Sequence, residues 1–90
     1  MKTIVNILVA RYVEKDSSEL ISNMCAALVS NVDIWPIDKT NRWIGFIQGV
    51  LYSKGLVDID EEREFTRPLF HAYYLRNNIP IPKTIIFLLF

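Results

Sequence analysis

The sequence has little of what most catalytic and metal sites require. Its 90 residues include one histidine, His71, and one cysteine, Cys25. A lone cysteine cannot form an internal disulfide, and its apolar neighbours predict a buried, unreactive thiol. A metal site would need several clustered histidine, cysteine or carboxylate ligands, and no glycine-rich phosphate loop, dinucleotide fingerprint or zinc-protease motif is present. We therefore predict no catalytic residues, no metal site and no cofactor.

The chain also lacks an excess of charge of either sign and a long apolar run. Ten basic and ten acidic residues cancel, so we expect neither a nucleic-acid binder nor a nucleic-acid mimic. The apolar run TIIFLLF, residues 84–90, is far shorter than the roughly 20 residues that span a bilayer. The first 16 residues contain no signal-peptide cleavage pattern. No membrane span and no secretion signal are expected.

What the chain does contain is enough apolar material for one core. Apolar residues make up 51% of the sequence and aromatic residues 12%, a composition that argues against disorder. Because 90 residues support one modest core, we predict a single domain over residues 1–90.

Helical signals recur along most of the sequence. Periodicity favours a helix over residues 3–13, although a strand is an alternative there. Asp16, with Glu19 three residues later, predicts a capped second helix that ends near Asn31. Its expected buried stripe consists of Leu20, Ile21, Met24 and Leu28. A third, strongly amphipathic helix is expected between Asp38 and Gly55.

A fourth helix is predicted from Asp58, which acts as its cap, to about Leu75, with a kink or break at Pro68. A helical wheel separates two sides of this helix. One side, expected to face the core, carries Phe65, Leu69, Ala72 and Tyr73. The other side carries Arg63, Arg67, His71 and Tyr74.

These elements predict a mainly α-helical bundle of three or four helices, followed by an extended apolar tail over residues 77–90. The expected core contains Trp43, Ile47, Val50, Leu51, Phe65 and Leu69. The alternative is an α+β fold in which the β-branched segments at the two ends of the chain pair as strands.

Two groups of residues are candidates for binding. Arg63, Arg67 and His71 would converge on a phosphate or carboxylate group, with Arg42 and Tyr74 as further contributors. Against this, Asp60 and Glu64 are spaced to pair with the two arginines of the fourth helix, which would leave a solvated and self-neutralised surface. The second candidate is Trp35, which either covers the core from a loop or serves as an exposed aromatic anchor.

The block NRWIGFIQGVL, followed by GLVDIDEEREFTRPLFHAYY, resembles a segment of small accessory proteins of tailed bacteriophages over residues 41–74. The resemblance implies expression in the cytoplasm of a bacterial host, where such proteins bind and inhibit host proteins. We therefore expect a non-enzymatic protein-interaction module, an inhibitor of a host enzyme or defence complex, whose partner is a host or phage protein. The alternative is a small-ligand protein that binds a nucleotide or another anion through its Arg/His surface.

The C-terminal tail predicts self-association. In TIIFLLF, residues 84–90, six of seven residues are apolar, and a monomer of this size has limited core left to receive them. Left exposed, such a β-prone segment promotes aggregation. We therefore expect a homodimer formed through the C-terminal tail.

Overall fold

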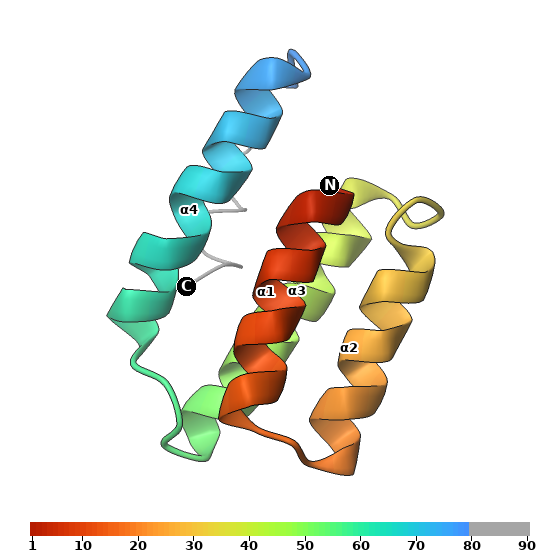
Figure 1. Ribbon diagram of the computed structural model, residues 1–90. Coiled ribbons are helices and arrows are strands. Elements are labelled where there is room, and N and C mark those ends of the chain that lie inside the picture. The colour runs from red at the N-terminus through yellow and green to blue at the C-terminus, as the bar shows by residue number, and fades with distance from the viewer. Residues whose placement is uncertain (80–90) are drawn as a thin grey trace.

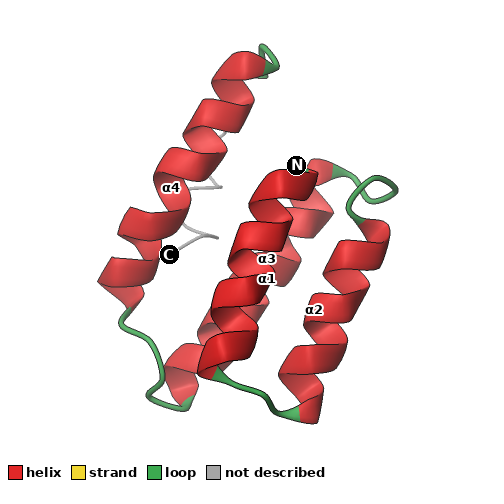
Figure 2. Cartoon of the chain, in the orientation of Figure 1, coloured by secondary structure: helices red, strands yellow, loops and turns green. Residues whose placement is uncertain are grey.

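A computed structural model describes residues 1–79, which form four α-helices and no strand (Figures 1 and 2). The helices are α1 (Lys2–Lys15), α2 (Glu19–Asn31), α3 (Ile37–Ser53) and α4 (Ile59–Arg76). Successive helices run in opposite directions, and α1 and α3 lie between α2 and α4 (Figure 1). The predicted helical fold is confirmed for this part of the chain. The α+β alternative is not supported, because the first segment is a helix.

The prediction of an extended tail falls largely on residues 80–90, which lie outside the described residues. The predicted homodimer contact falls on the same segment. Residues 77–79 leave α4 through a turn, in which Asn78 has a φ of 54°. That positive φ suits asparagine, whose short side chain tolerates the left-handed region.

Polar side chains set the helix boundaries. Asp58 begins α4 by accepting hydrogen bonds from the backbone amides of Asp60 (2.9 Å) and Glu61 (3.1 Å), as predicted. Gly55 ends the turn after α3 with a φ of 70°, also as predicted. The cap of α2 is a correction: it is Ser18, whose Oγ accepts from the amide of Ile21, while Asp16 instead accepts from the amide of Ser18.

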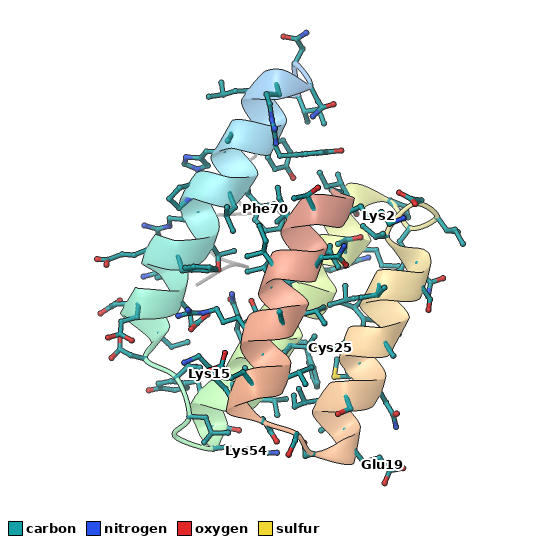
Figure 3. All side chains as sticks on the ribbon, in the orientation of Figure 1. Lys2, Lys15, Glu19, Cys25, Lys54 and Phe70 are labelled. Atoms are coloured by element: carbon teal, nitrogen blue, oxygen red, sulfur yellow. The ribbon has the colours of Figure 1, made fainter. Side chains whose placement is uncertain are left out.

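The four helices share one apolar core. Its buried members are Ile4, Val5, Leu8, Tyr12, Ile21, Cys25, Leu28, Val32, Ile44, Ile47, Leu51, Phe70 and Tyr74. Figure 3 shows Cys25 and Phe70 on the sides of α2 and α4 that face the centre of the bundle. Of the expected core residues, Ile47 and Leu51 are fully buried, and Trp43, Val50 and Leu69 pack against the core while half-buried. Leu20, expected in the buried stripe of α2, is 52% exposed.

The inward side of α4 differs from the predicted one. Glu62, Thr66, Phe70 and Tyr74 are its buried residues, spaced four apart. Phe65, predicted in the core, is 37% exposed, and Tyr74, predicted on the surface, is 1% exposed. The error arose because the pattern placed polar residues outside, whereas Glu62 and Thr66 are buried with polar partners. Pro68 does not break α4, which continues to Arg76.

Glu62 and Thr66, together with their polar partners on α1 and α3, form a polar layer within the bundle. Through this layer α1, α3 and α4 contact one another. Nε2 of Gln48 on α3 donates to the hydroxyl of Tyr12 on α1 (2.8 Å) and to Oγ1 of Thr66 on α4 (3.0 Å). Nearer the other end of α4, Nδ2 of Asn41 donates to the hydroxyl of Tyr74 (3.0 Å). Burial raises the pKa of both tyrosines, so the hydroxyls stay protonated and able to pair.

An ion pair completes this layer at the start of α4. Nη2 of Arg11 lies 2.9 Å from Oε1 of Glu62, and Nε of Arg11 donates to the same oxygen at 3.1 Å. The Glu62 side chain is 1% exposed and that of Arg11 is 27% exposed. The guanidinium also lies 4.2 Å from the centre of the Phe65 ring, which explains why that ring remains near the surface. The hydrogen bond that Arg11 donates to Glu62 raises the pKa of Arg11.

We predict that Arg11→Met lowers the free energy of unfolding by about 2 kcal/mol, because it leaves the buried Glu62 carboxylate without its partner. The loss falls short of that for a fully buried pair because Arg11 is partly exposed. Urea denaturation followed by circular dichroism measures it. The control is Lys54→Met, which removes the exposed cation 2.7 Å from Asp16 and should cost less. Equal losses in the two variants would contradict the assignment.

Candidate functional site: a groove between α2 and α3

Helix α3 carries a second stripe on the side opposite its core residues. Lys39, Arg42, Trp43 and Phe46 follow the spacing i, i+3, i+4, i+7, so they share one face of the helix. The core-facing stripe, which contains Ile44, Ile47, Gln48 and Leu51, lies on the other side. Thus one face of α3 packs against the core, and its outward face carries two aromatic rings and two cations.

This outward stripe lines a surface hollow of about 460 Å³, which we call the α2–α3 groove. Its lining consists of Met24 from α2 and Lys39, Arg42, Trp43 and Phe46 from α3. Phe46 is 58% exposed although it adjoins the fully buried Ile47. An exposed phenylalanine beside a methionine is a costly arrangement for a surface that contacts only water. The groove contributes two cations and no acidic side chain.

Trp35 lies beside the groove, at the end of the loop that joins α2 to α3. Its backbone amide donates to the carbonyl of Asn31 (2.8 Å), which holds the loop against the end of α2. The ring centres of Trp35 and Trp43 are 4.6 Å apart, with the planes tilted by 46°. Nζ of Lys39 lies 4.6 Å from the centre of the Trp35 ring. Trp35 is half-buried and packs against the core, which agrees with the first of its two predicted roles. Its role as an exposed aromatic anchor stays a prediction.

The remaining predicted binding residues lie on α4. Arg63, Arg67 and His71 are half-buried and follow one another at four-residue intervals; we call them the Arg/His face. Within the described part of the chain, the Nε atoms of Arg63 and Arg67 are buried without a hydrogen-bond partner. Arg42 does not join this face, because it lies on the outward side of α3, whereas α3 meets α4 through its inward side.

Two predictions for α4 are wrong. Asp60 and Glu64 do not neutralise Arg63 and Arg67, because the ion pairs among residues 1–79 are those of Arg11 with Glu62 and Lys54 with Asp16. The buried Glu62, rather than either predicted acid, is the carboxylate of α4 that is paired.

Tyr74 is not available as a surface binding residue either. Its side chain is 1% exposed, and its hydroxyl accepts from Asn41. It therefore belongs to the polar layer and not to the Arg/His face. This burial could not be predicted locally, because the position of a tyrosine in a helix does not show where its hydroxyl finds a partner.

A second hollow, of about 700 Å³, lies between α1 and α4. It is lined mostly by aliphatic residues from the start of α1 and the end of α4, among them Met1, Ile7 and Leu69, with Tyr73 and Arg76. Both hollows contain a methionine and an arginine, but the hollow between α1 and α4 has one aromatic ring, whereas the α2–α3 groove has two. Those residue types are the ones enriched in the centres of protein interfaces.

Of the five residues that line the α2–α3 groove, the sequence predicts only Arg42 as a binding residue. The sequence analysis places Trp43 in the core and does not connect it with the half-buried Lys39 and the exposed Phe46, which lie one turn before and after it. Their i, i+4, i+7 spacing was a usable signal. Met24 could not have been added in this way, because its place beside Trp43 depends on how α2 packs against α3.

Cys25 is buried in the core. Burial raises the pKa of the Cys25 thiol, which disfavours the reactive thiolate. Within residues 1–79, no group of three or more His, Cys, Asp or Glu side chains is arranged to hold a metal ion. In the same part of the chain, no helix combines the length and the apolar character that a membrane crossing requires.

We predict that Phe46→Ser changes the free energy of unfolding by less than about 1 kcal/mol, since most of the ring is in water. The adjacent Ile47→Ala should lower it by about 2–5 kcal/mol, because it opens a cavity in the core. Chemical denaturation of both variants checks this. A large loss in Phe46→Ser would mean that the ring serves stability and would remove the main reason to regard the groove as a binding surface.

No protein-family model matches this chain, and no curated protein or solved structure matches it. The resemblance of residues 41–74 to phage accessory proteins therefore stays a prediction. The case for a function depends on the residues of the α2–α3 groove and of the Arg/His face.

Proposed function

We propose that this protein is a non-enzymatic protein-interaction module and that the α2–α3 groove is its contact surface. The observation that carries the proposal is the exposure of Phe46 beside Trp43 and Met24, in a groove whose other two lining residues are cations. Aromatic residues, methionine and arginine dominate the energetics of protein interfaces. The Trp35–Trp43 contact gives the groove a rigid wall, which lowers the entropy lost on binding.

The resemblance of residues 41–74 to small phage accessory proteins supports a more specific form of this proposal. In that form the partner is a host enzyme or defence complex, or another phage protein, and binding inhibits it. The site of action is then the cytoplasm of the bacterial host. The buried thiol of Cys25 and its raised pKa support a role without catalysis.

A second candidate function is the binding of a nucleotide or another anion by the Arg/His face. One observation favours it: the Nε atoms of Arg63 and Arg67 are buried without a hydrogen-bond partner among residues 1–79. Guanidinium groups one helical turn apart suit a phosphate group. The proposal is weaker than the first because neither the α2–α3 groove nor the hollow between α1 and α4 is lined by these three side chains.

Site-specific photo-crosslinking tests the main proposal. Benzoylphenylalanine replaces Phe46 in one variant and Leu75, which is 71% exposed on α4, in the other. After irradiation in bacterial cells, we expect a discrete cross-linked protein from position 46 and none from position 75. The same product should disappear when Trp43→Ala is added to the first variant. Equal cross-linking at both positions would contradict the proposal. A cross-linked product that persists from position 46 in the Trp43→Ala variant would also contradict it.

We also propose that the chain forms a homodimer through its C-terminal tail, residues 77–90. The support is the apolar sequence TIIFLLF, residues 84–90. Sedimentation of the full chain and of a version ending at Asn78 tests this. We expect a dimer for the full chain and a monomer for the shortened one. A full-length monomer at micromolar concentrations would contradict the dimer, and a dimeric shortened chain would exclude the tail as its interface.

A further inference from the structure

The charges of the α2–α3 groove define its partner more closely. Lys39 and Arg42 are one helical turn apart on the outward face of α3, on the same side as Trp43 and Phe46. The chain as a whole has ten basic and ten acidic residues, so this local positive charge is not a consequence of a basic protein. It is a property of the groove.

Neither cation is neutralised within the described part of the chain. The ion pairs there use Arg11 and Lys54. Asp38 is one turn before Arg42 and therefore its neighbour on the helix surface, but it is in neither of these ion pairs. Lys39 instead lies over the Trp35 ring, which orients its ammonium group at the edge of the aromatic surface. A partner carboxylate can therefore reach both cations without displacing an existing acid.

The backbone around the groove limits the kind of segment that can bind. Within residues 1–79 there is no strand, so no sheet edge is available to add an extended peptide. A helix, in contrast, satisfies its own backbone hydrogen bonds and can lie along the groove between α2 and α3. Its apolar face would contact Met24, Trp43 and Phe46.

From these observations we infer that the α2–α3 groove binds an amphipathic helix of a partner protein, which places an apolar side chain on Phe46 and carboxylates opposite Lys39 and Arg42. Acidic residues three or four positions apart on the partner helix match the spacing of the two cations. This inference rests on the proposed interaction function and adds to it the chemistry of the partner.

A charge exchange tests the inference with the full chain. The probes are two designed helical peptides with the same leucine face, one with glutamates beside that face and the other with lysines at those positions. We expect the native protein to bind the glutamate peptide at least about tenfold more tightly in fluorescence anisotropy, because only that peptide pairs with both cations. The combined variant Lys39→Glu, Arg42→Glu should reverse this preference. Raised salt should weaken the preferred complex in each case.

The control variant Lys2→Glu, Lys15→Glu changes net charge equally at two exposed positions of α1. It should keep the native preference, and circular dichroism should show that both variants are folded. Equal binding of the two peptides, or a control that also reverses the preference, would overturn the inference. If cross-linking from position 46 persists in that case, the interaction function stands and only the acidic-helix partner is wrong. Self-association that is abolished by Phe46→Ser, without peptide binding, would identify a second copy as the occupant and also overturn the inference.

Discussion

The arrangement of the bundle depends on the side-chain amide of Gln48. Buried at the centre of α3, it donates to Tyr12 of α1 and to Thr66 of α4 at once. Hydrogen bonds have strict distance and direction requirements, whereas apolar contacts tolerate sliding. The two bonds therefore define how α1 and α4 sit against α3. The ion pair between Arg11 and Glu62 adds a further constraint at the start of α4. The inward face of α4 is therefore half polar.

This use of α3 explains where the candidate site lies. The inward face of α3 packs against the polar layer and the core. The outward face of the same helix carries Lys39, Arg42, Trp43 and Phe46. The exposed aromatic surface is held in place by residues that are not part of it. A change in the polar layer would alter stability first, whereas a change at the exposed Phe46 should leave stability nearly unchanged. The residues of α3 that stabilise the fold and those of the proposed binding surface thus lie on opposite sides of the helix.

Much of this fold could be predicted from the sequence, because helix periodicity and caps are local signals. The signals at Asp58 and Gly55 were sufficient for α4 and for the end of α3. The orientation of α4 could not be predicted in that way. Because polar residues usually lie on the surface, the sequence predicts that Glu62 and Thr66 are exposed. They are buried because Arg11 of α1 and Gln48 of α3 pair with them. Such partners are distant in the sequence.

The candidate site was predictable to a similar, limited degree. Trp35 and Arg42 were identified from the sequence, and both lie at or beside the α2–α3 groove. Phe46 and Met24 were not, since a groove between two helices exists only once both are packed. Tyr74 was misplaced because the predicted face of α4 was rotated toward it.

The methionine methyl groups provide the most direct measurement. The chain has two methionines; Met24 lines the α2–α3 groove, and Met1 lines the hollow between α1 and α4. In a protein labelled with ¹³C at these methyl groups, the two NMR signals report on the two hollows separately. On addition of the partner captured at position 46, or of the glutamate peptide, the Met24 signal should shift while the Met1 signal stays unchanged. A shift of the Met1 signal alone would contradict the assignment of the α2–α3 groove as the binding surface.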